Sequence, residues 1–443
     1  MLLEIAHREL HIELVDVLFR DLFQSEEDRF QRGQIGDLFY LPFQPLQLIK
    51  RIQVVRAHDV ILHVYETFEK LAGSGRVTIA LDGTPLTVST GGVARYTLEL
   101  ARALAGEFPE DQYWLLSDQI LPQLASLPAN LHMGSPPKTL PERRWWLFGL
   151  DREMSRRGVD LFHGTDFSVP YLPRRPSVMT VHDLSPWTHA DLQPDAVRVR
   201  RRTPALLRLG LASMVITPTE AVRREAIERF RLRPERVVAV PLAASPMFRR
   251  VEPRQLEGEQ PGSTPAKPYF LFVGTLEPRK NIARLIEAWR EVRKANDVDL
   301  VLAGRLRAGF PAPAPEPGLR VLGPVPEADL PGLYSGALAC AYPSLYEGFG
   351  LPVLEAMQCG AVVVTSRDPA VVEISGGEVS GGAAVHVDAT DTRALAGALA
   401  AVARAPENFT GLRERAIGRA AEFTWQRTAR RTREVYEAAR RVF

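Results

Sequence analysis

The stretch YFLFVGTLEPRKNIARLIEAW, from Tyr269 to Trp289, has the pattern of a buried strand followed by a turn and a helix. Its opening run is apolar and ends in glycine, and the later apolar residues recur at helical spacing. The same alternation continues as far as the segment AAVHVD, which ends at Asp388. Strands that alternate with helices predict βαβ units around a parallel sheet, and therefore an α/β fold.

The first half of the chain shows the same alternation. Short apolar runs such as RVTIALDG, which begins at Arg76, SVMTVHD and SMVITPT are separated by helical patterns. Residues 244–268 then lack periodicity and are rich in Pro, Gly, Glu and Ser, which is typical of a linker. We therefore expect two Rossmann-like doubly wound domains, residues 76–243 and 269–425, that face a common cleft. A helix over residues 426–443 is expected to pack back on the first domain.

Residues 1–75 stand apart from both domains. Apolar residues recur there near helical spacing, and the segment ends at Gly73-Ser74-Gly75, a flexible hinge signal. We expect a mostly helical extension that packs on the next domain, because amphipathic helices usually bury their apolar face. A partner-binding or membrane-surface module is the alternative. Charges interrupt the apolar residues of this segment every few positions, so it does not resemble a signal peptide.

The composition indicates an ordinary globular protein. Apolar residues make up 45% of the 443 positions and charged residues 24%, which is enough for substantial cores and a solvated surface. A net charge of +2 gives no reason to expect a nucleic-acid partner. The two cysteines, Cys340 and Cys359, make no disulfide framework, and no apolar run approaches the roughly 18 residues of a membrane-spanning helix. A reduced, cytoplasmic setting fits best.

Two cations occupy the turn of the opening stretch. Arg279 and Lys280 fall between the predicted strand and the predicted helix, and Asn281 follows as a candidate N-cap. Cations at the carboxyl end of a strand, beside a helix N-terminus, can form an anion site. Taken alone, the pair could equally be two solvated charges in a loop.

A second stretch, EGFGLPVLE, places two carboxylates around a turn that opens a helix. Glu347 lies on the loop, and Glu355 lies about one turn inside the helix. Gly348 and Gly350 allow backbone N–H groups to approach a ligand closely. One carboxylate can therefore meet one end of a ligand and the second another part, with the helix N-terminus between them. This geometry suits a nucleotide-sugar.

The two strings GTLEPRKN and PSLYEGFGLPVLEAM resemble those of the retaining family 4 glycosyltransferases with the GT-B fold, especially bacterial mannosyltransferase-type enzymes of polysaccharide assembly. The resemblance covers residues 76–443. It implies that Arg279 and Lys280 bind the donor diphosphate, that Glu347 contacts the transferred sugar, and that Glu355 contacts the ribose. The donor site would be completed by flanking residues, namely Gly274, Thr275, Phe349, Gly350 and Leu351.

The resemblance also implies two contributions from the first half. A glycine-rich loop after the first strand, here Gly91 and Gly92, would lie near the donor phosphates and the acceptor. A histidine at a strand end, here His182 followed by Asp183, would lie close to the transferred sugar. By itself His182 could be a satisfied histidine at the end of a strand, and His163 in LFHGTD leaves the same two readings open.

The family resemblance implies no metal and no cofactor, because the nucleotide-sugar is a substrate. Asp297 and Asp299 match the carboxylate-x-carboxylate pattern of metal-dependent transferases. They fall at the amino end of a predicted strand, away from the cleft edge, so we interpret them as a coincidence. Arg279 and Lys280 could neutralise the leaving diphosphate instead. In a retaining reaction Glu347 would stabilise positive charge on the sugar, and a role as covalent nucleophile stays open.

The expected function is hexose transfer, most simply of mannose from GDP-mannose, to a glycan or lipid-linked acceptor in the cytoplasm. A basic cluster, Arg198–Arg202 with Arg208, is either a solvated face or a contact with an anionic membrane or a lipid diphosphate. One alternative is a GT-B nucleotide-sugar epimerase or hydrolase. The other is a catalytically degenerate, partner-binding subunit.

Overall fold

The computed structural model describes residues 76–443, apart from residues 89–90, 140–141, 190–195, 253–266 and 378–380. Residues 76–443 form one compact unit. The predicted helical extension, residues 1–75, lies outside the described residues, as does most of the predicted linker.

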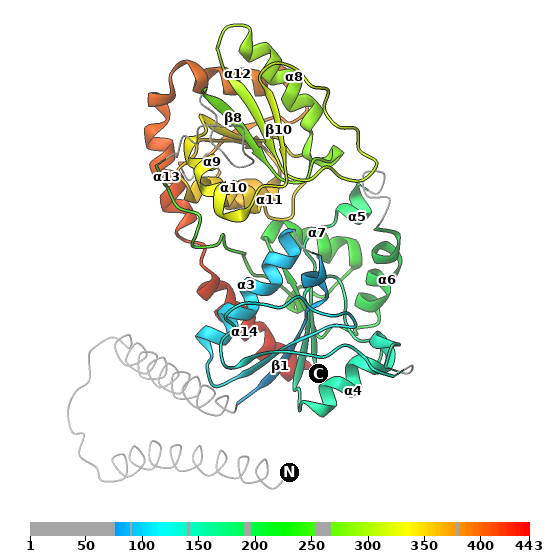
Figure 1. Ribbon diagram of the computed structural model, residues 1–443. Helices are drawn as coiled ribbons and strands as arrows, with labels where there is room; N and C mark the ends of the chain where they lie inside the picture. The colour runs from blue at the N-terminus through cyan, green and yellow to red at the C-terminus, as the bar shows by residue number, and fades with distance from the viewer. Residues whose placement is uncertain (1–75, 89–90, 140–141, 190–195, 253–266, 378–380) are drawn as a thin grey trace, which may run out of the picture. The chain divides into compact units, whose positions relative to one another are not determined.

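The first half contains a seven-stranded parallel sheet with the order β3-β2-β1-β4-β5-β6-β7. Its strands are β1 (Thr78–Asp82), β2 (Gln112–Leu116), β3 (Leu131–Met133), β4 (Leu161–Gly164), β5 (Ser177–Thr180), β6 (Met214–Thr217) and β7 (Val237–Ala239). Its helices are α3 (Gly92–Glu107), α4 (Leu150–Arg156), α5 (Ser185–Thr188), α6 (Val197–Arg208) and α7 (Glu220–Phe230). Figure 1 shows these elements from blue to green.

The second half contains a six-stranded sheet, also parallel, with the order β10-β9-β8-β11-β12-β13. Its strands are β8 (Tyr269–Val273), β9 (Asp299–Ala303), β10 (Leu319–Gly323), β11 (Ala339–Tyr342), β12 (Val363–Ser366) and β13 (Val385–Val387). Its helices are α8 (Ile282–Arg293), α9 (Leu330–Gly336), α10 (Leu351–Gln358), α11 (Pro369–Ser375), α12 (Thr392–Arg404) and α13 (Thr410–Ala420).

The strands of the second sheet have the composition that a parallel sheet requires. Every residue of β8, β9, β11 and β12 is buried, which is possible because helices cover both faces of the sheet. Trp289 of α8 lies in this core, and its indole N–H donates to the carbonyl oxygen of Val298 at 3.0 Å. The predicted α/β fold with two doubly wound sheets is confirmed.

The order of the strands locates the crevices where ligands bind. In the second sheet the chain reverses direction of winding between β8 and β11, and in the first sheet between β1 and β4. Open α/β sheets bind ligands at such switch points, outside the carboxyl ends of the strands. The segments that follow β8 and β11 are the two strings singled out in the sequence, GTLEPRKN and PSLYEGFGLP.

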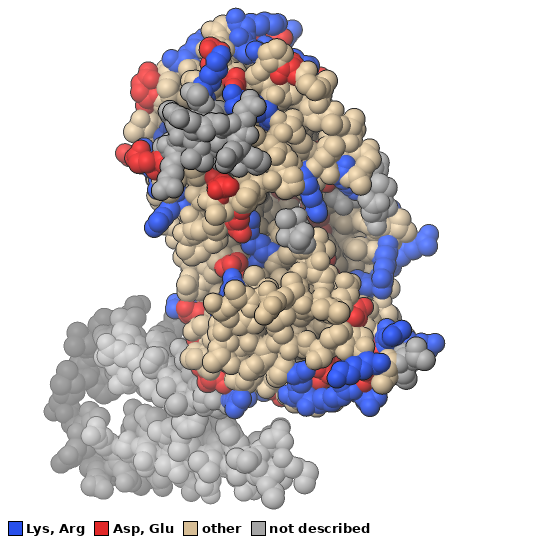
Figure 2. Space-filling view, in the orientation of Figure 1, with Lys and Arg blue, Asp and Glu red and all other residues tan. Residues whose placement is uncertain are grey.

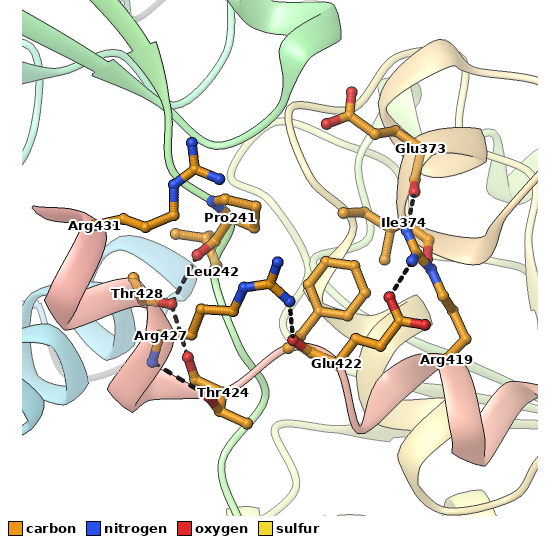
Figure 3. A pocket seen from close by; sticks show the side chains of 11 residues that line it. Pro241, Leu242, Glu373, Ile374, Arg419, Glu422, Thr424, Arg427, Thr428 and Arg431 are labelled. Carbon is orange, nitrogen blue, oxygen red and sulfur yellow. Dashed lines mark hydrogen bonds and ion pairs between the residues drawn. The ribbon is translucent and has the colours of Figure 1, made fainter. Parts of the chain in front are cut away.

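The last helix, α14 (Trp425–Val442), leaves the second half and packs on the first. Arg433 of α14 forms a buried ion pair with Asp111 at 2.9 Å, and the Tyr436 hydroxyl lies 2.7 Å from Nδ1 of His163. The red helix beside α3 in Figure 1 is α14. Where the chain crosses, the Thr428 hydroxyl donates to the carbonyl oxygen of Pro241 at 2.7 Å, beside the pocket of about 130 Å³ drawn in Figure 3.

Candidate active site

The two cations of the predicted anion site lie immediately after β8, within a single 3₁₀ turn. This turn spans Pro278–Lys280, and Gly274, with a φ of 149°, leads the chain out of the strand toward Thr275. Lys280 is buried, and only 11% of the Arg279 side chain is exposed. Solvated loop charges would be exposed, so this alternative reading of the pair is wrong.

Asn281 does not cap α8 as the sequence suggested. It occupies the N-cap position in the left-handed conformation, with a φ of 60°, and its side chain accepts no capping hydrogen bond. The side-chain amide instead donates to the carbonyl oxygens of Pro343, at 3.1 Å, and Ala389, at 2.7 Å. Asn281 therefore ties the cationic turn to the loop after β11, on which Glu347 lies.

Glu347 lies between the two cations. Its Oε1 accepts from Nζ of Lys280 at 2.5 Å, and its Oε2 accepts from a guanidinium nitrogen of Arg279 at 3.2 Å. Lys280 also donates to the hydroxyl of Tyr342 at 2.5 Å. Burial acts to raise the pKa of Glu347, but the two cations outweigh it and lower the pKa to about 2. Glu347 is therefore an ionised carboxylate in a buried setting.

The same setting shifts the pKa values of the two cations in opposite directions. Burial lowers the pKa of Lys280 from its usual value of 10.5, since desolvation outweighs the attraction of Glu347. Burial would also lower the pKa of Arg279, but Glu347 and Asp183 outweigh it and raise that pKa. Arg279 also pairs with Glu277 at 2.8 Å, and Glu277 pairs in turn with Arg307 at 3.4 Å. Three cations and two carboxylates thus give this ion-paired cluster a formal excess charge of +1. This small excess of positive charge, in a crevice with little water, favours an incoming polyphosphate.

The glycine-rich turn after Glu347 lies against the first half. A Cβ atom on Gly348 would lie 2.0 Å from the carbonyl oxygen of His182, so no larger residue fits there. The carbonyl oxygen of Gly348 accepts from the Thr219 hydroxyl at 3.0 Å. Phe349 is buried, and Gly350, with a φ of 95°, leads directly into α10 at Leu351.

Glu355 lies inside α10 and is only 2% exposed. The guanidinium of Arg95, from α3 of the first half, donates to Oε1, and the Tyr334 hydroxyl donates to Oε2 at 3.0 Å. Burial raises the pKa of Glu355 to about 7, even though Arg95 and Tyr334 favour the ionised form. The two glutamates of EGFGLPVLE thus have opposite electrostatic settings.

The first-half residues approach this site from the other sheet. His182 is half-buried, and its Nε2 donates to the carbonyl oxygen of Thr165 at 2.7 Å. Asp183 accepts at Oδ1 from the backbone and hydroxyl of Ser185, at 2.9 and 2.7 Å. Gly91 and Gly92 are exposed, and a Cβ atom on Gly92 would lie 3.8 Å from Leu351. The structure therefore brings Gly92, His182 and Asp183 to the turn and cations of the second half.

His163, by contrast, is a satisfied core histidine. It is fully buried, with its two ring nitrogens 2.7 Å from the Tyr436 hydroxyl and 2.8 Å from the Thr180 hydroxyl. Burial lowers its pKa to about 3, so it stays neutral. Of the two readings that the sequence left open for His163, the structural one holds.

Three residues near the site were not singled out from the sequence. Arg95 reaches Glu355 from a residue separation of 260, which no local motif could signal. Asp82, at the carboxyl end of β1, is buried, and burial raises its pKa to about 6. Asp166 follows β4 at the same switch point, and burial raises its pKa as well. In the sequence, Asp82 and Asp166 could have been recognised as site candidates by their position at the carboxyl end of a predicted strand.

The structure places the carboxylate-x-carboxylate pattern away from the site. Asp297 is exposed and pairs with Lys267 at 2.9 Å, and Asp299 begins β9 and pairs with Arg320 at 3.1 Å. Both therefore lie at the amino end of their strand. Across the described parts of residues 76–443, no three His, Cys, Asp or Glu side chains are grouped so that they could hold a metal ion.

Two family models match the chain, one for each half. The model described as Glycosyltransferase Family 4 matches residues 90–246, and the model described as Glycosyl transferases group 1 matches residues 254–422. The first match ends and the second begins within the predicted linker, residues 244–268.

Individual relatives agree with the family models. O-antigen chain mannosyltransferase B of Escherichia coli is 32% identical over 62% of this chain and 74% of its own length. MMP alpha-(1->4)-mannosyltransferase of Mycolicibacterium hassiacum is 29% identical over 55% of this chain and 56% of its own. The solved structure of sucrose-phosphate synthase from Thermosynechococcus elongatus shares the fold, with a TM-score of 0.61, 20% identity, and coverage of 82% of this chain and 98% of its own. In the described part of the chain, no helix combines the length and apolar character that crossing a bilayer requires.

Proposed function

The chain belongs to the family 4 glycosyltransferases with the GT-B fold, and from this premise we propose that it transfers a hexose, with retention, from a nucleotide-sugar to a glycan or lipid-linked acceptor. One observation carries the proposal. The buried carboxylate of Glu347 is held between Arg279 and Lys280, at the carboxyl ends of β8 and β11. A diphosphate needs the cations, and a sugar that develops positive charge needs the carboxylate.

The donor that we propose is GDP-mannose. The support for mannose is the similarity to two relatives that are named as mannosyltransferases. The diphosphate would take hydrogen bonds from Arg279 and Lys280, which would then share their donors between the phosphates and Glu347. The ribose hydroxyls would donate to Glu355.

The chemistry that we propose needs no protein nucleophile. The bond between the anomeric carbon and the diphosphate oxygen breaks, and the departing electron pair stays on the diphosphate beside Arg279 and Lys280. The acceptor hydroxyl adds to the same face of the sugar, and its proton passes to the departing phosphate. Glu347, ionised because the two cations lower its pKa, stabilises the positive charge that develops on the ring. His182 would orient the sugar from the first half.

No metal takes part in this proposal, because the two cations and the N-terminus of α10 act on the leaving diphosphate. We propose that the acceptor lies on the first-half side, along the carboxyl ends of β1 and β4. Asp82 and Asp166 lie there and can accept hydrogen bonds from acceptor hydroxyls.

Contact with an anionic membrane in the cytoplasm is the further part of the proposal. In the basic cluster of α6, the side chains of Arg200 and Arg202 are directed to protein oxygens, of Pro186 and Ser168, whereas Arg198 and Arg201 are exposed. Figure 2 shows more Lys and Arg along the lower edge of the first half, where Figure 1 places α4. Exposed arginines of this kind attract anionic headgroups, with about 1 kcal/mol for each residue near the surface.

A thermal-shift screen of nucleotide-sugars tests the donor. A ligand present at 100 times its dissociation constant stabilises the folded protein by about 2.7 kcal/mol, so GDP-mannose should raise the melting temperature more than other nucleotide-sugars. Incubation of the best ligand with and without acceptor extracts then separates transfer from hydrolysis. Release of free sugar at the same rate without acceptor would favour the hydrolase alternative, and stabilisation by no nucleotide-sugar would contradict the proposal.

A further inference from the structure

The carboxylate that is expected to bind ribose already has a partner from the opposite half. Arg95 lies in the first turn of α3, three residues after Gly92, and its guanidinium donates to Oε1 of Glu355. Glu355 is 2% exposed and the Arg95 side chain 24% exposed, so the pair is largely shielded from water. This contact crosses between the two sheets, and it lies in the region where the donor would bind.

The guanidinium of Arg95 is itself held in place by the second half. Its Nε lies 3.0 Å from Oε1 of Glu327, which lies in the 3₁₀ turn before α9, and its central carbon lies 5.6 Å from the ring centre of Phe248. The planar fork of an arginine loses little freedom when it is fixed in this way. Arg95 is thus oriented by an acid, an aromatic ring and its own carboxylate partner.

From this geometry we propose that Arg95 is a positioning residue for donor binding: it aligns the carboxylate of Glu355 for the ribose hydroxyls, so that the first half completes the ribose site. The inference rests on the proposed function, in which Glu355 accepts from ribose.

The lone pairs of Glu355 make this arrangement workable. An ionised carboxylate offers about four lone-pair positions. Arg95 uses one on Oε1 and the Tyr334 hydroxyl uses one on Oε2, which leaves each oxygen with a further position for a ribose hydroxyl. The carboxylate is therefore clamped at both oxygens without being saturated.

Arg95 is also the group that most favours the ionised form of Glu355. The titratable and charged groups that face Glu355 are Arg95 from α3, Tyr334 from α9, Glu327 from the turn before α9, Cys340 from β11 and Cys359 after α10. Arg95 is the cation among them, and burial raises the pKa of Glu355 to about 7 in spite of it. Loss of Arg95 would raise this pKa further, and a protonated carboxyl would accept fewer ribose hydrogen bonds.

The test compares two ligands with one diphosphate. The probe is GDP or UDP, whichever binds the full-length protein more tightly, together with its 2′,3′-dideoxy analogue, which lacks the ribose hydroxyls. Dissociation constants are measured by titration calorimetry between pH 5.5 and 8.5. The ratio of the two constants reports the ribose contacts alone, because both ligands carry the same titrating phosphate.

The variants are Arg95→Gln and Arg95→Lys, with Arg102→Gln as the matched control. Arg102 lies two turns further along α3 and pairs with Glu99 at 3.6 Å, away from Glu355. Arg95→Gln should lose about 10-fold to 100-fold in affinity for the ribose-bearing ligand at pH 7.5, with little change for the dideoxy ligand. The pH at which the ribose advantage is lost should rise by about one unit or more. Arg95→Lys keeps the charge, so it should retain part of the affinity for the ribose-bearing ligand and part of the wild-type pH dependence. Arg102→Gln should match the wild type.

Three results would overturn the inference. The first is an Arg95→Gln variant with the wild-type ribose advantage and pH midpoint. The second is an equal loss for both ligands, which would place Arg95 on the phosphates or in the fold. The third is a wild-type protein that binds both ligands equally, which would show that the ribose role proposed for Glu355 is itself wrong. If Arg95→Gln does not fold, the shift in Arg95→Lys decides the question.

Discussion

The two halves share one architecture but hold their site residues differently. In the second half the charged residues are buried and paired, with Glu347 6% exposed and Lys280 7% exposed. In the first half Gly91 and Gly92 are exposed and His182 is half-buried. The second half therefore contains an electrostatic site that exists before any ligand arrives, whereas the first half supplies a surface that borders it.

The difference shows how each half can be tested. Buried charges that depend on one another respond strongly to single substitutions, because the partner is left unpaired in a medium with little water. Substitutions of the exposed glycines and of the half-buried histidine should instead act by changing the shape of the surface. Substitutions in the charged site of the second half should therefore give electrostatic effects that substitutions of Gly91, Gly92 or His182 would not show.

The largest effect is expected from removing both cations. Arg279→Ala with Lys280→Ala should weaken binding of a free nucleoside diphosphate by about 10²–10⁴-fold, because each charged hydrogen bond contributes about 1.5–3 kcal/mol. Titration calorimetry measures this. The control is Arg290→Ala with Lys294→Ala, since these two cations are exposed in α8 and at its C-cap, and pair with Glu316 and Glu291. If the folded double variant bound the nucleoside diphosphate with unchanged affinity, the diphosphate could not bind at this turn.

Glu347→Gln should mainly lower turnover. We expect a fall of about 10²–10³-fold with a small change in donor KM, because the carboxylate acts on charge that is present only in the transition state. Steady-state kinetics on folded protein gives both constants. Asp297→Asn, an exposed acid of the same half, is the control. Full turnover in Glu347→Gln would mean that Glu347 is not at the reacting sugar.

The two glutamates should affect stability with opposite pH dependence. The pKa of Glu347, about 2, lies below the ordinary 4.5, so its contribution is present above pH 4.5 and is lost as the pH falls toward 2. The pKa of Glu355, about 7, lies above that value, so ionisation costs stability as the pH rises from 4.5 to 7. Each change amounts to about 3–4 kcal/mol.

Urea unfolding of Glu347→Gln and Glu355→Gln at several pH values measures these changes. Relative to the wild type, Glu347→Gln should be most destabilised near neutral pH and less so near pH 3. Glu355→Gln should compare more favourably with the wild type at pH 8 than at pH 5. Parallel curves for the two variants would show that the two carboxylates do not differ in their electrostatic setting.

A smaller kinetic effect is expected for Glu355→Gln. Ribose contacts change little as the glycosidic bond breaks, so the donor KM should rise about tenfold while turnover stays within a few-fold. The same assay as for Glu347→Gln applies. If kcat and the donor KM changed in the same proportion in Glu347→Gln and Glu355→Gln, the two glutamates would not have the different roles that we propose.

No effect is expected from chelation. If the two cations and α10 neutralise the diphosphate, activity should survive dialysis against EDTA. Loss of activity that magnesium or manganese restores would contradict this and would return attention to Asp299 and its neighbours.

The fold and the charged cluster of the second half could be predicted because their signals are local. Buried strands of a parallel sheet are continuous apolar runs, and the two charged motifs lie in the segments that follow β8 and β11. Asn281 shows the limit of local reasoning. Its residue type and position suggested a cap, but carbonyl oxygens of Pro343 and Ala389, far along the chain, took its side-chain donors.

The first half was harder to predict because its contributions are single residues. His163 and His182 both end apolar runs, and only the packing of Tyr436 shows that His163 belongs to the core. Arg95 is one arginine on an amphipathic helix, where solvent exposure is the usual outcome. Its partner Glu355 comes from the other sheet, so the pair arises only when both halves are folded.

The position of α14 has a consequence for synthesis of the protein. The first half ends its sheet with β7 at Ala239, yet it packs against a helix that begins at Trp425. At about 5–20 residues per second, a ribosome needs roughly 10–40 s to make the intervening segment. Throughout that interval the nascent first half presents the surface that Tyr436 and Arg433 later cover, with Asp111 lacking its cation. A helix that is translated late therefore completes the domain that was translated early.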